Sequence, residues 1–409
     1  MYGLVLEGGG ARGSYQVGAC KALQELGVEI DAVAGTSIGA LNGAMLVQGQ
    51  LDRAYDLWYN ISPSQVFDIE EARLLELKSL DISHDGLLYF MKKAREIAQD
   101  KGLDITFIKK LLCENIQEQR LRRAKLLFGF VTISLTDFKP LELFLDDIPE
   151  GRVIEYLLAS ANLPAFKQEK IDGKRYMDGG FYDNLPLNML VKKGYKDIIA
   201  IRTKAPGRTR KVLNPHVRVK YIATDENLGG ILDFDKTQAR FNLKLGYYDA
   251  YRKWQGLKGF RYYLRPTGDE ELFLNFLLAP GEKAILNLGR TLGMQGIPYR
   301  RLLFEHIIPK FALLLDLPKE SSYEDLVIAI LELVASDNKV ERFKIYTFNE
   351  FLGVIRQNCQ RGRILKEQEN FKLPVFVKQS DILSRAVKDK VVREMINELF
   401  ADYLKAPLS

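Results

Sequence analysis

The segment Ile30-Asp31-Ala32-Val33-Ala34-Gly35-Thr36-Ser37-Ile38-Gly39 decides the fold of this chain of 409 residues. Its first half is a short apolar run that predicts a strand. Residues 40–51 carry apolar side chains at three- and four-residue spacing, which predicts a helix. A strand that turns directly into a helix is the repeating unit of sheets with helices on their faces. The segment therefore predicts an α/β fold.

The same turn presents a serine. Gly35-Thr36-Ser37-Ile38-Gly39 fits G-x-S-x-G between a strand and a helix, a context that pushes the central hydroxyl into the open. Glycine is needed two residues to either side because a Cβ atom there would collide in so tight a turn. We therefore predict that Ser37 is a nucleophile and that Gly35 and Gly39 shape its turn.

A second strand-to-helix junction comes earlier in the chain. Residues 3–6 predict a strand that ends in Gly8-Gly9-Gly10-Ala11-Arg12-Gly13, where consecutive glycines let backbone amides approach a ligand oxygen. Loops that follow neighbouring parallel strands meet at the same edge of the sheet. An oxyanion hole beside Ser37, formed by the amides of Gly8, Gly9 and Gly10, would explain why both loops are rich in glycine.

The glycine loop has an alternative interpretation. Gly8 to Gly13 also fits the dinucleotide-binding pattern G-x-G-x-x-G, and Asp31 lies near the position of a ribose-binding acid. A nucleotide-dependent oxidoreductase, however, gives Ser37 no role and needs a substrate domain that the sequence does not present. We favour a hydrolase, which needs no cofactor.

A serine nucleophile needs a base. The three histidines lie outside strand-to-loop motifs, which argues against a Ser-His-Asp triad; they are His84, His216 and His306. Asp178 ends a predicted strand in Met177-Asp178-Gly179-Gly180, and the two glycines allow a tight turn and a close approach to the Ser37 loop. We predict that Asp178 is the base and that partial desolvation raises its pKa.

In their order along the chain, these motifs resemble the patatin-like phospholipase family, with its G-G-G-x-R-G loop, G-x-S-x-G elbow and D-G-G motif. Three further segments are similar to family segments: Ala159–Phe166 to A-S-x-x-x-P-x-F, Asp178–Pro186 to D-G-G-x-x-x-N-x-P, and Gly229–Phe234 with Leu245–Tyr247 to a stretch of bacterial members. The resemblance covers roughly residues 1 to 265.

The resemblance implies a three-layer α/β sandwich with a central, mostly parallel sheet. It also implies a Ser37–Asp178 dyad that hydrolyses fatty acyl esters of phospholipids, lysophospholipids or galactolipids. Gly8, Gly9 and Gly10 would supply the oxyanion amides, and Arg12 with Gly13 would support the loop or receive a substrate phosphate. Four residues are expected to shape the site rather than to react: Pro164, Gly179, Gly180 and Asn184.

Three alternatives to a lipid hydrolase remain open at this point. A transacylase and a non-lipid esterase would use the same site. A catalytically silent lipid-binding regulatory protein would keep the fold and lose the chemistry.

The pattern of the chain changes along its length. We predict a catalytic domain at residues 1–268, interrupted by a charged helical insertion at about 61–125, and a C-terminal helical region at 269–409 without an assigned role. Further strands are predicted at 126–134, 141–145, 198–202 and 259–264. Asp172-Gly173 predicts a hairpin turn.

Two signals concern the C-terminal region. Ser321 and Glu324 predict a capping box at the start of a helix. The apolar stripe from Val391 to Tyr403 has a mixed-charge opposite face, which predicts a packed helix rather than one lying on a membrane.

The composition limits the classes of partner that this chain is expected to bind. The net charge of +6, from 59 basic and 53 acidic residues, is too small to predict nucleic-acid binding. It suits peripheral contact with an anionic membrane, for which the basic residues around Arg120–Lys125 are the candidate surface. The three scattered cysteines, Cys20, Cys113 and Cys359, predict neither disulfides nor a metal site.

The sequence also suggests a location. It has no run of about 20 apolar residues that would predict a membrane span, and its first residues do not resemble an export signal. We therefore expect a cytoplasmic protein, peripheral at the inner membrane surface, that acts on an acyl lipid without metal or cofactor. Nothing in the sequence indicates the oligomeric state.

Overall fold

The computed structural model describes residues 1–62, 106–164, 166, 170–360 and 385–406. They form two compact units, Met1–Trp254 and Gln255–Ser409. Most of the predicted insertion at 61–125, including His84, lies outside the described residues. The assignment of a catalytic domain to residues 1–268 stays a prediction.

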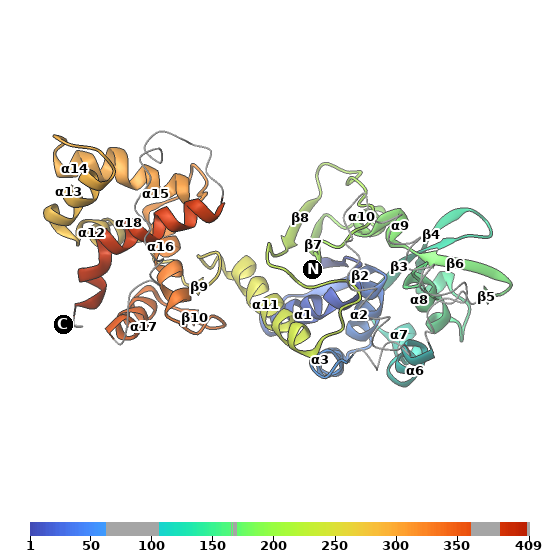
Figure 1. The fold of residues 1–409 in the computed structure, drawn as a ribbon. Helices are drawn as coiled ribbons and strands as arrows, with labels where there is room; N and C mark the ends of the chain where they lie inside the picture. Colours follow the sequence, from blue (N-terminus) through green and yellow to red (C-terminus); the bar gives the residue numbers. More distant parts are fainter. Residues whose placement is uncertain (63–105, 165, 167–169, 361–384, 407–409) are drawn as a thin grey trace. The chain divides into compact units, whose positions relative to one another are not determined.

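The first unit contains a sheet whose strands follow the order β5-β6-β3-β2-β1-β7-β8, with β4 as a further neighbour of β3 (Figure 1). The strands are β1 Tyr2–Leu6, β2 Ile30–Thr36, β3 Leu127–Ser134, β4 Lys139–Phe144, β5 Lys170–Ile171, β6 Lys174–Asp178, β7 Asp197–Ile201 and β8 Arg218–Ile222. Neighbours from β3 through β2, β1 and β7 to β8 are parallel, whereas β4 and β6 run antiparallel to β3. The predicted α/β fold with a central, mostly parallel sheet is confirmed.

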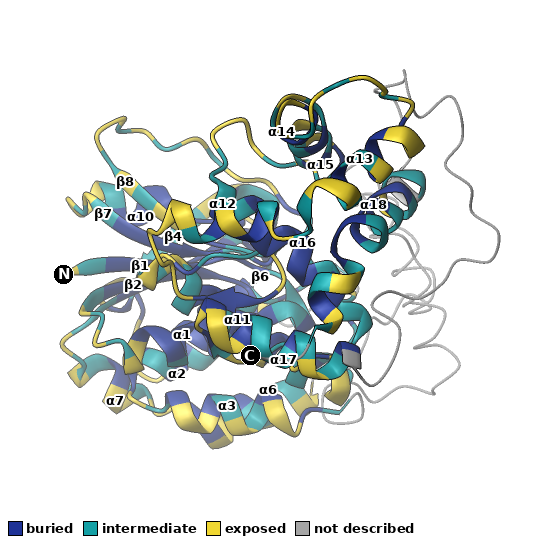
Figure 2. Cartoon of the chain, turned by 90° about the vertical axis from the view of Figure 1, so that its left-hand side faces the viewer, coloured by how far each residue is buried: buried dark blue, intermediate teal, exposed yellow. Residues whose placement is uncertain are grey.

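Helices cover both faces of this sheet and complete three layers. On one face lie α1 Gly13–Glu25, α2 Ile38–Val47 and α3 Leu51–Tyr59; on the other lie α9 Gly180–Asp183 and α10 Leu187–Lys192. Because strand side chains alternate between faces, Leu6 and Val33 meet Gly43 of α2, whereas Val5 and Ala32 pack with α10. The outward face of α3 is exposed and appears yellow in Figure 2.

The other α-helices among the described residues of the first unit are α6 Thr106–Asn115, α7 Glu118–Arg123, α8 Val153–Ser160 and α11 Lys236–Gln255. Helices α1 and α11 cross with their backbones in contact. A Cβ atom on Gly18 would lie 1.9 Å from the Leu243 carbonyl oxygen, and one on Gly246 would lie 1.9 Å from that of Tyr15. The crossing therefore requires glycine on both helices.

The second unit is helical around its own apolar core. Its described helices are α12 Glu270–Leu278, α13 Gly281–Thr291, α14 Tyr299–Arg301, α15 Ile308–Leu314, α16 Tyr323–Asp337, α17 Phe348–Gln360 and α18 Arg385–Lys405, with a π-helical turn at Leu302–Ile307. The stripe of α18 is buried in this core, including Val391, Met395 and Phe400. The prediction of a packed helix is confirmed. Among the described residues, no helix has the length and apolarity to cross a bilayer.

Local predictions had mixed outcomes. The hairpin turn at Asp172-Gly173 is confirmed: both residues have positive φ, 50° and 76°, as a two-residue turn between β5 and β6 requires. The capping box was predicted one residue early, since Ser322 and Asp325 form it. Two adjacent serines offer two registers, and the sequence does not distinguish them.

The predicted sheet strand at 259–264 is wrong. Only β9 Tyr263–Leu264 is extended, and it pairs with β10 Ile345–Tyr346 in a separate two-stranded sheet of the second unit. An apolar run indicates burial, but it does not indicate which sheet buries it. Strand β8 was not predicted, since its side chains are mostly exposed at the sheet edge and form no apolar run.

Candidate active site

Strand β3 brings Ser37 and Asp178 together. Thr36, the last residue of β2, pairs with Val131, and Asp178, the last residue of β6, pairs with the next residue, Thr132. Strand β4 occupies the opposite edge of β3 at both positions. Strands β2 and β6 therefore pair one after the other with the same edge of β3. Their last residues lie opposite consecutive residues of β3, which places the predicted nucleophile next to the predicted base.

The turn at Ser37 is strained in the way its motif predicts. Ser37 has φ 55° and ψ −125°, a conformation that non-glycine residues rarely adopt and that is often found at functional sites. The flanking glycines are sterically required. A Cβ atom on Gly35 would lie 2.4 Å from the backbone of Gly39, and one on Gly39 would lie 2.3 Å from the Leu6 carbonyl oxygen.

Ser160 holds this turn, a role that the sequence did not reveal. The Ser37 amide donates to Ser160 Oγ at 3.1 Å, and Ser160 Oγ donates to the Val131 carbonyl oxygen at 2.7 Å. The carbonyl oxygens of Asn162 and Ser160 also accept from the amides of Asp178 and Gly179. The segment Ala159–Phe166, noted only as a motif, thus fixes both predicted catalytic residues.

The Asp178 carboxyl group is buried, with 3% of the residue exposed. Burial raises its pKa to about 6, although interactions with the Ser37 hydroxyl and the Gly180 amide lower it. The Gly180 amide donates to Oδ1 at 2.7 Å, whereas Oδ2 has no hydrogen-bond partner among the described residues. The hydroxyl is therefore near enough to affect the charge of Asp178 without a hydrogen bond of ordinary geometry.

The glycine loop follows β1 directly. Gly10 has φ 54°, and a Cβ atom on it would lie 2.0 Å from the Ile231 carbonyl oxygen, so only glycine fits. The Gly8 amide donates to the Asn184 carbonyl oxygen at 3.0 Å. Within the described residues, the amides of Gly9 and Gly10 have no acceptor. Of the three predicted oxyanion donors, these two are available to a ligand.

Arg12 supports the loop. Its Nε donates to the Gly229 carbonyl oxygen at 2.7 Å, and its Nη1 donates to those of Lys204 at 3.0 Å and Thr203 at 3.3 Å. Burial lowers the pKa of this guanidinium, and the charge of Glu7 opposes that effect. The geometry favours support over capture of a substrate phosphate. Gly13 begins α1, and a Cβ atom there would lie 2.5 Å from Ile38.

Glu7 is a second support that the sequence analysis overlooked. It is fully buried, and its carboxylate accepts from the Arg202 guanidinium at 2.9 Å and from the amides of Thr203 and Lys204 at 2.7 and 2.8 Å. Thr203 Oγ1 in turn donates to the Gly8 carbonyl oxygen at 2.5 Å. The feature of the sequence that could have indicated this role is a carboxylate directly after an apolar strand.

Asn184 lies where three glycine-containing segments meet. Cβ atoms on Gly8, Gly180 and Gly207 would lie 2.2, 2.7 and 2.7 Å from its side chain. Its Nδ2 is buried without a hydrogen-bond partner among the described residues. Gly179 is equally constrained, since a Cβ atom there would lie 2.3 Å from the Val131 carbonyl oxygen.

Two cavities meet at Ser37. The smaller is lined by most of the predicted site residues: Gly9, Gly10, Ser37, Pro164, Asp178, Gly180 and Asn184, with Leu163, Phe181, Ala205, Pro206 and Ile231. The larger, of about 1070 Å³ including its opening, is almost wholly apolar; it is lined among others by Leu41, Met45, Leu57, Trp58, Ile108, Leu111, Phe166 and Phe234. A site for polar chemistry thus adjoins a space that suits a hydrocarbon chain.

The described residues include two of the three histidines, His216 and His306. Neither His216 nor His306 lines either cavity. Within the described part of the chain, no cluster of His, Cys, Asp and Glu could hold a metal ion.

Comparisons with known proteins agree with the motifs. The patatin-like phospholipase domain-containing protein ZK370.4 of Caenorhabditis elegans is 28% identical over 309 residues, 72% of this chain and 20% of that protein. Lysophospholipase nte1 of Aspergillus terreus is 67% identical over 43 residues, 10% of this chain and 3% of that protein. The similarity spans a fifth or less of the length of these relatives.

A solved structure and a family model complete the comparison. VipD from Legionella pneumophila aligns with a TM-score of 0.38 and 14% identity over 99% of this chain and 92% of that one, which is too low to assign a fold. The model of patatin-like phospholipases matches residues 4–191. These residues therefore form a domain that is similar to the patatin-like phospholipases.

Proposed function

We propose that this chain is a serine lipid acyl hydrolase in which Ser37 is the nucleophile and Asp178 the base. The observation that carries the proposal is the small cavity lined by Ser37, Asp178, Gly9 and Gly10. A hydroxyl, a carboxyl group of raised pKa and two amides without acceptors are the groups that acyl transfer needs.

The first half of the reaction forms an acyl-enzyme. The Asp178 carboxylate accepts the Ser37 hydroxyl proton as Oγ bonds to the ester carbonyl carbon. The carbonyl oxygen becomes an oxyanion, which the amides of Gly9 and Gly10 stabilise. When the tetrahedral intermediate collapses, Asp178 returns the proton to the departing alcohol oxygen.

The second half releases the fatty acid. Water transfers a proton to Asp178 and attacks the acyl carbon, and the oxyanion forms again at the same amides. Collapse breaks the bond to Oγ, and Asp178 returns the proton to Ser37. A carboxyl group with a pKa of about 6 is a more effective base than an ordinary aspartate because its pKa lies nearer to neutrality.

The apolar cavity supports a fatty acyl substrate. Apart from Ser37, the two polar lining residues with amide side chains are Asn42 and Asn115. Their side chains are hydrogen-bonded within the protein, so they offer a ligand little polarity. Burial of hydrocarbon contributes about 0.8 kcal/mol per CH₂. We propose that the acyl chain occupies this cavity while the alcohol portion of the ester occupies the smaller one.

We propose phospholipids or lysophospholipids as the substrates. The family and the name of the Aspergillus relative, a lysophospholipase, support this class.

A lipid panel tests the proposal. Purified wild type, Ser37→Ala and Asp178→Asn are incubated with diacyl and monoacyl phospholipids, and released products are identified by mass spectrometry. Wild type should release free fatty acid, and both variants should not. Ser134→Ala is the matched control, because Ser134 is also a buried serine but lines neither cavity.

Other outcomes would redirect the assignment. Fatty acyl transfer to an added alcohol in preference to water would make the protein a transacylase. Failure of Ser37 to react with a fluorophosphonate would leave a silent lipid-binding protein. Turnover retained in Ser37→Ala would refute the dyad.

A further inference from the structure

The segment made of β7, β8 and the connection between them has an unusual charge. Between Asp197 and Asp225 the sequence contains seven Lys and Arg residues and no Asp or Glu. This stretch alone has a formal charge of +7, whereas the whole chain has +6. The basic residues are Arg202, Lys204, Arg208, Arg210, Lys211, Arg218 and Lys220. The net charge of the whole chain therefore does not reveal that this stretch is strongly basic.

The connection is fixed to the segments that carry the site. The Arg208 amide donates to the Gly180 carbonyl oxygen at 3.0 Å, and the Arg208 carbonyl oxygen accepts from the Asn184 amide at 2.6 Å. The Asn188 side chain bonds to the carbonyl oxygen of Lys211 at 2.8 Å and the amide of Leu213 at 2.9 Å. In Figure 1 the connection leaves the sheet beside α9 and α10. The backbone of this connection is therefore held beside the segment that follows Asp178.

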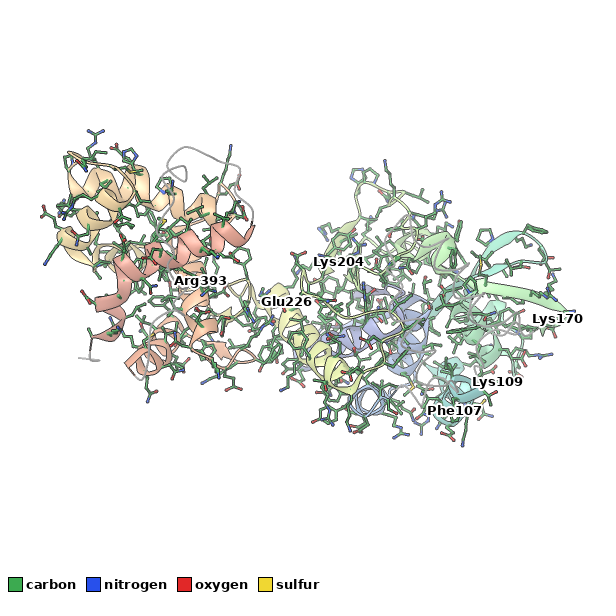
Figure 3. All side chains as sticks on the ribbon, in the orientation of Figure 1. Phe107, Lys109, Lys170, Lys204, Glu226 and Arg393 are labelled. Atoms are coloured by element: carbon green, nitrogen blue, oxygen red, sulfur yellow. The ribbon has the colours of Figure 1, made fainter. Side chains whose placement is uncertain are left out.

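The same connection lines the catalytic cavity. Ala205 and Pro206 are part of the lining that includes Ser37 and Asp178. Lys204, labelled in Figure 3, and Arg208 flank this stretch in sequence. A lipid whose ester lies at Ser37 would direct its headgroup toward this edge of the cavity.

Several of these basic side chains are already engaged. Arg202 pairs with Glu7, Arg210 with Glu142, Arg218 with Asp197, and Lys204 with Asp225. Arg208 and Lys211 are exposed and have no ion pair among the described residues. Leu213, two residues beyond Lys211, is 64% exposed. Two available cations next to an exposed aliphatic side chain form an amphipathic surface.

We propose that residues 204–213, the β7–β8 loop, are a docking surface for an anionic lipid bilayer. Arg208 and Lys211 contact headgroup phosphates, and Leu213 enters the interface. The loop then holds the mouth of the catalytic cavity against the membrane, an inference that rests on the proposed lipid hydrolysis. Cations near an anionic surface and an apolar side chain at the boundary are the standard elements of peripheral binding.

The α7 surface suggested by the sequence fits a membrane less well. Its central cation, Arg122, is bound to the Glu118 carboxylate and to the carbonyl oxygens of Leu145 and Ile148. Arg120 and Arg123 are exposed, and Glu118 is the one acidic residue of α7 beside its three arginines. These two arginines provide a matched control with the same change in charge.

Vesicle sedimentation tests the proposal, with every variant made in the Ser37→Ala background so that no lipid is consumed. The parent should sediment with vesicles of equal parts phosphatidylcholine and phosphatidylglycerol, but not with phosphatidylcholine alone. Arg208→Ala with Lys211→Ala should lower the partition roughly 25-fold, about fivefold for each cation. Arg120→Ala with Arg123→Ala should leave it unchanged. Leu213→Ser should weaken binding even at high salt, where screening has removed most of the charge effect.

Three results would overturn the inference: loop variants that bind like the parent, loss of binding in the α7 variant instead, or tighter binding of a DNA duplex than of anionic vesicles at the same salt. Thermal unfolding of each variant excludes a folding defect. Because the background is inactive, the result does not depend on whether the chain hydrolyses lipids, which the lipid panel decides separately.

Discussion

The two cavities that meet at Ser37 have opposite linings. In the apolar cavity, even the asparagine side chains are hydrogen-bonded within the protein. In the polar cavity, Asp178 Oδ2 and Asn184 Nδ2 are buried without partners among the described residues. A buried polar atom without a partner lowers stability by about 1–3 kcal/mol. Folding alone therefore does not account for the polar cavity.

The strongest test of this contrast removes the reacting groups. Ser37→Ala and Asp178→Asn should each lower kcat by about 10³-fold or more, because each removes a group needed at every turnover. Steady-state kinetics on one phospholipid gives the value. Comparable loss after a substitution confined to the apolar cavity would break the distinction.

Asp178→Asn should also stabilise the protein. The folded-state pKa of about 6 exceeds that of an exposed aspartate, so the folded state binds this proton more tightly than the unfolded state. Stability then falls as pH rises from about 4 to 6 and stays lower above that range. At pH 8 the variant should be more stable by up to about 3 kcal/mol. Denaturant unfolding measures it, and a less stable variant would contradict the account.

Distortion of the glycine loop should cause the next largest loss of activity. Gly10→Ala places a Cβ atom 2.0 Å from the Ile231 carbonyl oxygen, which displaces the amides beside Ser37. We expect kcat to fall about 10²-fold, as when an oxyanion donor is lost. Gly27→Ala is the control, because Gly27 also has positive φ, 66°, but no atom lies within 4 Å of the added Cβ. Equal losses in both variants would assign the effect to backbone strain.

On the apolar side, a substitution should alter selectivity more than rate. Leu41→Trp adds bulk to the wall of the apolar cavity and should lower kcat/KM for long-chain esters about tenfold relative to short-chain esters. The short-chain ester is an internal control for folding. An equal loss for both chain lengths would show that the acyl chain does not occupy this cavity.

The pH profile gives the smallest effect and identifies the base. Asp178 must be ionised to accept the Ser37 proton, so kcat/KM should be half its plateau at a pH of about 6 and fall below it. Asn184→Asp adds a carboxylate beside this cavity and should move the midpoint upward. Asp183→Asn should not move it: burial raises the pKa of Asp183 to about 7, but Asp183 lines neither cavity. A midpoint that follows Asp183 would exclude Asp178 as the titrating group.

The residues of the polar cavity were easier to predict from the sequence than those of the apolar cavity. Ser37, Asp178 and the glycine loop sit in short local motifs because tight turns demand particular residues, and parallel pairing then brings the turns together. The walls of the apolar cavity come from α2, α3, α6 and α8, and no local pattern links residues so distant in sequence.

Supporting residues were missed for a related reason. Glu7 and Ser160 act through hydrogen bonds to segments far along the chain, which neither residue type reveals by itself. The Gly8 amide was assigned to the oxyanion hole, although the fold pairs it with Asn184. The two-residue strand β9 shows the same limit, since local apolarity did not specify its partner.

The consecutive positions of Thr36 and Asp178 along β3 have a consequence for refolding. The two reacting groups come together only after β2 and β6 have both docked on that strand, and contacts between distant parts of a chain form slowly. Regain of catalytic activity after dilution from denaturant should therefore lag behind regain of helical circular dichroism. Recovery of turnover would then report a late step in the folding of the first unit.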